Sequence, residues 1–293
     1  MKLTHSKAVA MMVVVTLMWS IAGVVTRHLE SARSFEVTFW RSFFTVGALL
    51  IILPALQGRA VFAKIRGGGV ALWLSGVCWA VMFTAFMLAL TLTTVANVLV
   101  TMAVGPFVTA LLARIFIGDR IPRRTWVAIA MAGVGIAWMY AGEIDLSSHL
   151  TGTLVALLVP VASACNWTIV QHSRARGRSL DLVPAVLTGA VVSTLVTLPL
   201  SFPLLATEHD LWLLALLGLV QLAIPCALSV LCASVLKAPE MALLALLEVI
   251  FGILLAWLGA GEVPGAHVLS GGLLVMTALV INELIGWRKN DKF

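Results

Sequence analysis

Charged residues are scarce in this sequence. Lysine, arginine, aspartate and glutamate make up only 11% of the 293 residues, whereas a soluble domain has about 25%. Hydrophobic residues make up 61%, and the mean hydropathy is +1.07. The chain has too little polar surface to cover a water-soluble globule, so its composition indicates that lipid is its main solvent.

Cysteine and histidine are also few, and neither has the spacing of a metal site. The four cysteines lie within apolar segments without C-x-x-C spacing, and the six histidines lie at the ends of apolar segments or outside them. The sequence has no H-E-x-x-H, no pair of carboxylates inside an apolar segment and no G-x-x-x-x-G-K-[ST]. We therefore expect no disulfide, metal ion, cofactor or ATP-binding site, and we predict that the chain is not an enzyme.

Ten segments are long and apolar enough to span a bilayer, which takes about 20 residues. They cover residues 8–27, 35–56, 70–91, 94–116, 123–142, 150–171, 182–203, 211–234, 239–260 and 267–287. The connections between them are short. The sequence therefore predicts an all-α integral membrane protein with ten transmembrane helices.

The basic residues gather in alternate connections. If the N-terminus lies inside, 16 of the 19 lysines and arginines lie on the cytoplasmic side. They are Lys2, Lys7, Arg59, Lys64, Arg66, Arg114, Arg120, Arg123, Arg124, Arg174, Arg176, Arg178, Lys237, Arg288, Lys289 and Lys292. Because positive residues favour the cytoplasmic side, we predict that both termini are cytoplasmic. This asymmetry also explains the pI of about 9.6 without a nucleic-acid partner.

One predicted span occurs in two related copies. Residues 96–122 match residues 238–264 at an offset of 142, and Pro106 falls on Glu248. Each half of the chain has five spans, and an odd number inverts the second half relative to the first. We predict two inverted repeats, residues 1–145 and 146–293. Inverted repeats are typical of secondary transporters, whose substrate site lies near the midplane between the repeats.

Glu248 is the acidic residue at the centre of this repeated span. It lies about 15 Å into the span at 1.5 Å per residue, in a hydrocarbon layer about 30 Å thick. A charged carboxylate there costs at least about 2.5 kcal/mol. It can bind a substrate amine or take part in proton coupling. The alternative is a protonated carboxyl group that joins two helices.

Several aromatic residues also lie at mid-depth. Trp19, Trp79, Phe83 and Trp167 can form a cavity wall that stacks on an aromatic or cationic ligand, or they can be core or lipid-facing bulk. Pro106 removes a backbone donor and interrupts its helix. The backbone carbonyl that loses this donor can contact substrate. Alternatively, the interruption only gives the helix a fixed shape.

Polar residues inside the spans are open to two interpretations. Thr101, Asn166 and Gln221 can line the transport path or hydrogen bond between helices. Arg41 is expected about 9 Å below the outer surface by the helical rise, from where it can snorkel to that surface. A gating or structural ion pair is the alternative for Arg41.

Small residues in the fifth and tenth spans predict close helix contacts. Gly133 and Gly135 lie in the fifth span, and Gly271 and Gly272 lie in the tenth. Glycine lets two helix backbones approach each other in lipid. We interpret these positions as close contacts between helices.

The sequence resembles the EamA-type branch of the drug/metabolite transporter superfamily. The resemblance rests on ten spans in two fives, M-W-S-I-A-G-V-V-T-R at 18–27, an alanine before spans 4 and 9, and G-D-R-I-P or G-E-V-P after them. Within the family, the chain is most similar to YddG-like bacterial exporters of aromatic amino acids. The family commonly has Glu-Pro in span 9, whereas here Val249 follows Glu248 and the proline is Pro106 of the other half.

The resemblance implies a multi-pass transporter in the bacterial inner membrane. Spans 1, 3, 4, 6, 8 and 9 would line a central cavity that opens alternately to each side. The expected cavity residues are Trp19, Trp79, Phe83, Thr101, Pro106, Asn166, Trp167, Gln221 and Glu248. The expected partners are the lipid bilayer and an exported small metabolite, most often an amino acid and in particular an aromatic one.

Three alternatives and several properties stay open at this stage. The chain can instead export lipophilic cations, drugs or other metabolites. From other functional classes, an intramembrane enzyme and a passive channel are the competing hypotheses. The sequence leaves proton coupling, oligomeric state and resting conformation undetermined.

Overall fold

A computed structural model describes residues 3–26, 28–32, 34–58, 60–92, 98, 101–102, 104–118, 121–139, 150–175, 181–260 and 265–290. Every regular element within these ranges is helical, which confirms the all-α prediction for them. Five segments are long and apolar enough to cross a membrane: His5–Thr26, Phe35–Ala55, Gly69–Ala89, Thr151–Ser173 and Glu208–Ala233. Shorter apolar helices cover Gly105–Ile117, Pro184–Leu200 and Leu269–Asn282.

The described helices follow the predicted spans. Uninterrupted ones are α1 (His5–Thr26), α2 (Ser34–Gln57), α4 (Gly69–Leu92), α7 (Arg123–Met139), α8 (Leu150–Ala175) and α14 (Ala266–Asn290). Interrupted ones are α6 (Gly105–Leu112) with η1 (Ala113–Ile117); α9 (Pro184–Thr197) with η2 (Leu198–Leu200); α10 (Glu208–Leu216), η3 (Leu217–Ala223) and α11 (Ile224–Ala233); and α12 (Ala238–Ala245) with α13 (Leu247–Ala260). The sequence analysis did not predict the short helix α3 (Ala60–Gly67).

Some sequence predictions concern residues outside the described ranges. These include much of the first part of the span at 94–116, the G-E-V-P motif at 261–264, and basic residues such as Lys2, Arg59 and Arg176.

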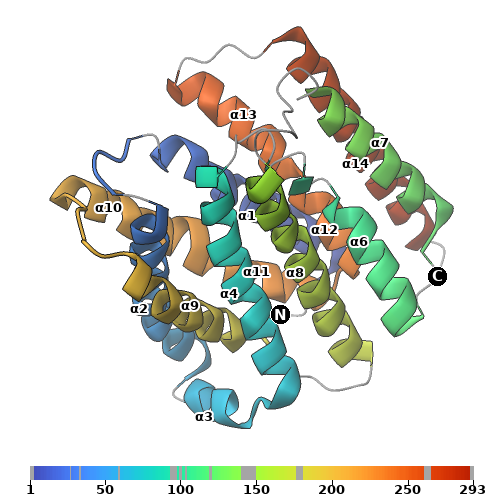
Figure 1. Ribbon diagram of the computed structural model, residues 1–293. Helices are drawn as coiled ribbons and strands as arrows, with labels where there is room; N and C mark the ends of the chain where they lie inside the picture. Colours follow the sequence, from blue (N-terminus) through green and yellow to red (C-terminus); the bar gives the residue numbers. More distant parts are fainter. Residues whose placement is uncertain are drawn as a thin grey trace.

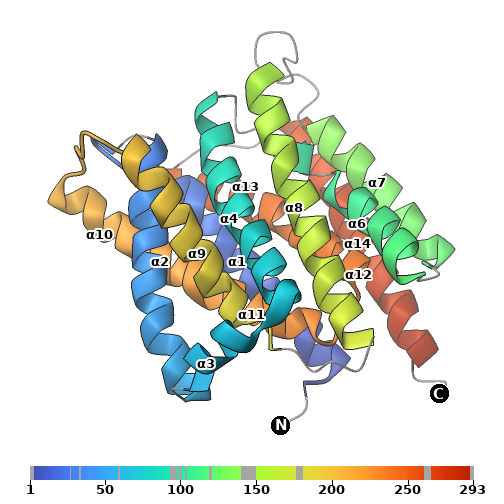
Figure 2. The ribbon, with the colours of Figure 1, turned by 60° about the horizontal axis from the view of Figure 1, so that its bottom comes forward.

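The helices form a central group flanked by two outer sets. α4 packs against α8, α1 packs against α11 and α13, and α6 packs against α8 and α12. α7 and α14 lie side by side at one edge of the molecule, and α2 and α9 lie together toward the opposite edge (Figures 1 and 2). The centre of the molecule is therefore built from helices of both halves of the chain.

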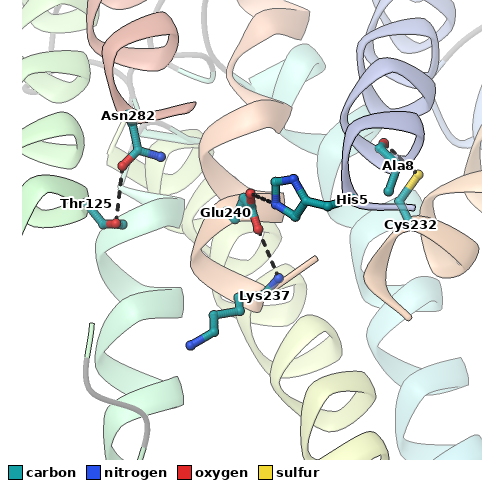
Figure 3. Close-up of polar contacts among 7 residues, drawn as sticks. All are labelled: His5, Ala8, Thr125, Cys232, Lys237, Glu240 and Asn282. Atoms are coloured by element: carbon teal, nitrogen blue, oxygen red, sulfur yellow. Dashed lines mark hydrogen bonds and ion pairs between the residues drawn. The ribbon is translucent and has the colours of Figure 1, made fainter. Parts of the chain in front are cut away.

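Close backbone contact holds α7 against α14. A side-chain carbon added at Gly135 would lie 2.8 Å from the Gly271 carbonyl oxygen, whereas one added at Gly133 would meet nothing within 4 Å. Thr125 also donates a hydrogen bond of 3.2 Å to Asn282 between these helices (Figure 3). The structure thus places Gly135 and Gly271 in a contact within one chain.

Polar contacts fix the ends of the central helices. At one end, the His5 ring contacts the Glu240 carboxylate at 2.7 Å, and the Cys232 thiol donates to the Ala8 carbonyl at 3.4 Å (Figure 3). These contacts tie the start of α1 to α12 and α11. They set the position of α1, which carries Trp19 farther along.

A carboxylate ties the connection after α1 to the start of α10. Asp210 accepts hydrogen bonds from the backbone N–H groups of Glu30, Ser31 and Ala32 at 2.8 to 3.0 Å. Its own backbone N–H is capped by the Thr207 hydroxyl at 3.1 Å. The Asp210 carboxylate also accepts a hydrogen bond from the Thr207 backbone N–H at 3.3 Å, which completes the cap of α10. The same buried carboxylate therefore takes part in a helix cap and holds a connection from the other half of the chain.

Candidate functional site

Two helices of the central group are interrupted at matching positions. The N–H of Val104 donates to the Thr101 carbonyl at 3.2 Å, and α6 begins at the next residue. The N–H of Leu246 donates to the Leu243 carbonyl at 3.1 Å, and α13 begins at the next residue. Leu246 follows Val104 by 142 residues, the offset that relates the two matched segments. Two helix N-termini therefore lie at equivalent points of the two segments.

A cavity of about 130 Å³ lies between these helices. A cavity of about 150 Å³ in another protein holds a benzene molecule, so this one has the scale of a single aromatic ring. Seven of the nine expected cavity residues line it: Trp19, Trp79, Phe83, Pro106, Trp167, Gln221 and Glu248. Other lining residues, which the sequence analysis did not place in the cavity, include Arg41, Met82, Phe86, Met102, Pro160, Ser163 and Cys226.

Aromatic rings form much of the cavity wall. The Trp79 ring packs edge-on to Trp167, with 5.8 Å between centroids, and lies 5.5 Å from the Phe83 ring. The indole N–H groups of Trp79 and Trp167 are buried and have no hydrogen-bond partner. Because a buried indole N–H normally finds a partner, these two donors indicate a place for a polar ligand or water.

Arg41 reaches this cavity from α2. Its side chain is only 1% exposed, and its Nη2 donates to the Phe83 carbonyl at 2.9 Å. Its Nε has no partner. The expectation that Arg41 snorkels to the outer surface is therefore wrong. The guanidinium turns inward because a backbone carbonyl of α4 accepts its hydrogen bond there.

A close contact between α2 and η3 sets the position of Arg41. A side-chain carbon at Gly218 would lie 2.8 Å from the Arg41 carbonyl oxygen and 2.6 Å from Cβ of Phe44. The Thr45 hydroxyl donates to the carbonyls of both Arg41 and Gly218, at 2.8 and 3.0 Å. The absence of a side chain at Gly218 lets α2 come near enough for Arg41 to face the cavity. The arginine's presence inside an apolar span was the signal for it in the sequence.

Glu248 lies in the first turn of α13 and is half-buried. Its charge is close enough to that of Arg41 for the two to interact. Within the described ranges, however, the ion pairs join His5 with Glu240 and Lys64 with Asp181, and none joins Arg41 with Glu248. The two charges therefore line one cavity without direct contact.

Gln221 adds a polar group on the π-helix η3. Its side-chain N–H lies 3.5 Å from the Trp19 carbonyl, and its buried Oε1 has no partner. π-helical turns are rare and are frequent at functional sites. This acceptor is a further group that a polar ligand can satisfy.

Asn166 and Thr101 are not among the residues that line the cavity. The Asn166 Oδ1 accepts a 2.6 Å hydrogen bond from Ser75, which joins α8 to α4. Thr101 is half-buried, and its carbonyl takes part in the turn before α6. Asn166 has the interhelical contact that was the alternative for it in the sequence analysis.

The chain is similar to known proteins in both sequence and fold. Residues 6–141 match the EamA-like transporter family. The pseudopaline exporter CntI of Pseudomonas aeruginosa, from strains UCBPP-PA14 and PAO1, is 29% identical over 248 residues, which cover 84% of each chain. A protein crystal structure superposes with a TM-score of 0.79, covering 97% of this chain and 98% of its own. At 16% identity, that likeness shows the fold alone.

Residues 6–141 are therefore similar to EamA-like transporters, and the apolar helices of the described ranges are consistent with a multi-pass membrane protein. Both the matching family and the curated relatives are transporters. The curated relatives named above export pseudopaline. Specificity for aromatic amino acids therefore stays a prediction.

Proposed function

We propose that this chain is a secondary transporter that exports small metabolites bearing an ammonium group, aromatic amino acids foremost, from the cytoplasm. The observation that carries the proposal is Glu248, which faces an aromatic-walled cavity without an ion-pair partner in the described part of the chain. A carboxylate held in this way binds an ammonium group by a charge-assisted hydrogen bond.

The walls of the cavity suit the rest of such a substrate. Trp19, Trp79, Phe83 and Trp167 offer apolar faces that stack on an aromatic ring and attract a nearby cation. A small-molecule site typically has such a mainly apolar lining with a few convergent polar groups.

The packing of the helices supports two inverted repeats, residues 1–145 and 146–293. In this proposal α1 corresponds to α8, α2 to α9, α4 to the α10–η3–α11 segment, α6 to α12–α13, and α7 to α14. The α4–α8 contact then has its counterpart in α1 with α11 and η3, and α6–α8 has its counterpart in α13–α1. The α2–α9 and α7–α14 contacts each join a helix to its own counterpart in the other repeat. The matching interruptions at Val104 and Leu246 are further support.

The transport cycle follows from this arrangement. Ten spans with both termini in the cytoplasm would place the interrupted helices near the bilayer midplane, where such transporters bind substrate. The two halves would rock around the cavity and expose it first to one side of the membrane and then to the other. Glu248 is the cavity carboxylate through which a proton gradient would be coupled.

The test is flux in proteoliposomes. Purified protein should give saturable uptake of labelled tryptophan or phenylalanine, accelerated by unlabelled amino acid on the opposite side. Such counterflow separates a carrier from a passive channel. A pH gradient applied to the wild type and to Glu248→Gln tests coupling, because a response in the wild type alone would assign it to Glu248. Absence of amino-acid flux from folded protein would overturn the substrate assignment.

A second candidate is export of pseudopaline or a similar metabolite, because the curated relative at 29% identity is a pseudopaline exporter. A third is export of lipophilic cations, for which one cavity carboxylate and aromatic walls are also suitable. Running pseudopaline and a lipophilic cation beside tryptophan in the same flux assay separates the three.

A further inference from the structure

The cavity contains a cation as well as an anion. Arg41 is almost fully buried, and a charged side chain inside a membrane is costly unless a partner or a water-filled cavity compensates it. Glu248 lines the same cavity, yet no ion pair links it to Arg41 in the ranges that the structure describes. Two opposite charges that do not neutralise each other directly leave room for a molecule that neutralises both.

The guanidinium of Arg41 has donors left for an anion. An arginine has five N–H donors in a planar fork that fits a carboxylate. Here Nη2 donates to the Phe83 carbonyl at 2.9 Å, and Nε is buried without a partner. The contact with Phe83 fixes the plane of the fork before a ligand arrives, which reduces the entropy lost on binding.

The other unpaired polar groups of the cavity also include both donors and an acceptor. The indole N–H groups of Trp79 and Trp167 are buried donors, and Oε1 of Gln221 is a buried acceptor, all three without partners. Donors suit the carboxylate of a ligand, and acceptors suit its ammonium group. All three residues line the cavity with Arg41 and Glu248.

We propose that Arg41 and Glu248 together select zwitterions: the guanidinium binds the carboxylate of the substrate while Glu248 binds its ammonium group. The inference rests on the proposed function and narrows it, because it excludes ligands that carry only one of the two charges. A lipophilic amine leaves Arg41 unpaired in the cavity, and a simple acid leaves Glu248 unpaired. A buried polar group without its partner discriminates strongly against the incomplete ligand.

The experiment compares three indoles of similar size. Tryptophan carries both charges, tryptamine carries only the ammonium group, and indole-3-propionate carries only the carboxylate. Wild-type protein in proteoliposomes should transport tryptophan at least about tenfold faster than either analogue, since each missing charge-assisted contact is worth about a factor of ten or more. Arg41→Gln should lose the preference over tryptamine but keep the preference over indole-3-propionate. Glu248→Gln should lose the preference over indole-3-propionate but keep the preference over tryptamine.

Two further variants control for general damage. Arg41→Lys keeps the charge without the fork and should recover part of the preference over tryptamine. Arg114→Gln removes an exposed arginine from η1 and should leave all three rates unchanged. If Arg41→Gln does not fold, ligand-induced thermal stabilisation of the wild type in detergent takes its place, and tryptophan should stabilise more than either analogue.

The outcomes separate the two proposals. Equal transport of tryptophan and tryptamine by the wild type, or an unchanged preference in Arg41→Gln, would overturn the zwitterion inference and leave the exporter standing. Equal stabilisation by the three indoles would do the same. Transport of none of the three by folded wild-type protein would overturn the amino-acid export on which the inference rests.

Discussion

The two interrupted helices have the same backbone hydrogen bond at the interruption, but they place different side chains at the cavity. Val104 and Leu246 make the same short-range hydrogen bond before α6 and α13, and both new helices begin at the cavity. At the second residue of each new helix, however, the cavity wall has Pro106 in α6 and Glu248 in α13. The backbone interruption is thus common to both halves, whereas the charge belongs to one.

This difference separates movement from recognition. An interrupted helix can bend at the interruption, and a pair of them at matched positions suits two halves that rock around a site. Proline favours such an interruption because it lacks a backbone donor. A carboxylate contributes nothing to this flexibility, but it gives the site a preferred ligand charge. Substitutions at the two matched residues should therefore fail in different ways.

The largest effect is expected for Glu248→Gln. It keeps the size of the side chain and removes its charge, so the charge-assisted bond to an ammonium group is lost. Such bonds are worth about 1.5 to 3 kcal/mol, and we expect tryptophan counterflow to fall at least about tenfold. The initial rate at subsaturating substrate is the measurement.

The matched control for that variant is Glu240→Gln in α12. Glu240 pairs with His5 at 2.7 Å and does not line the cavity. A partly exposed pair of this kind contributes about 0 to 1 kcal/mol, so transport should change by no more than about fivefold. Equal losses in the two variants would mean that the role of Glu248 is structural.

A smaller effect is expected for Pro106→Ala. Alanine supplies the missing backbone donor and favours a continuous helix through residue 104, which should stiffen the segment. We expect the maximal transport rate to fall about three- to fivefold with little change in substrate affinity, because a conformational step is slowed. Rates measured over a range of tryptophan concentrations separate the two quantities.

Pro54→Ala is the control for that substitution. Pro54 also lies inside a helix, α2, but it does not line the cavity. Its replacement should leave the maximal rate nearly unchanged. A loss of affinity in Pro106→Ala, with the maximal rate preserved, would instead make Pro106 a contact residue for the substrate.

Much of the cavity lining could be predicted from depth along the sequence. A carboxylate at the centre of an apolar span, mid-span tryptophans and the alignment of Pro106 with Glu248 each identified a residue that lines the cavity. These signals work because the cost of a polar group in lipid depends mainly on its depth. The helices were predictable for the same reason, since span length is fixed by bilayer thickness.

The direction in which a helix turns its side chains was not predictable in this way. Arg41 faces the cavity because α2 contacts η3 at Gly218, and no periodicity in α2 contains that information. Asn166 lies at a plausible depth but turns to Ser75. The π-helical turn of η3 likewise leaves no trace in hydropathy. The depth of a residue in the membrane follows from its place in its own span. The direction of its side chain depends on tertiary contacts between distant segments.

Gly218→Ala tests the contact that positions Arg41. The added carbon would lie 2.8 Å from the Arg41 carbonyl oxygen, a backbone atom, so α2 and η3 must separate. We expect a loss of about 1 to 3 kcal/mol in stability. Tryptophan transport should also fall, because the guanidinium shifts away from the position in which it binds the substrate. Gly47→Ala in α2 is the control, because its added carbon meets nothing within 4 Å.

The smallest effect on transport is expected for Gly135→Ala, which disturbs the α7–α14 pair. Its added carbon would lie 2.8 Å from the Gly271 carbonyl oxygen, so the two helices must separate, and the apparent melting temperature should fall by several degrees. Among the residues that the structure describes, neither helix contributes to the cavity lining. Transport per folded molecule should therefore stay within about twofold of the wild type if the pair is a static support. Gly133→Ala has open space around its added carbon and should change neither quantity. If Gly135→Ala slowed transport as much as Pro106→Ala while Gly133→Ala did not, movement would extend to the outer pair. The interrupted helices would then be one part of a larger moving unit.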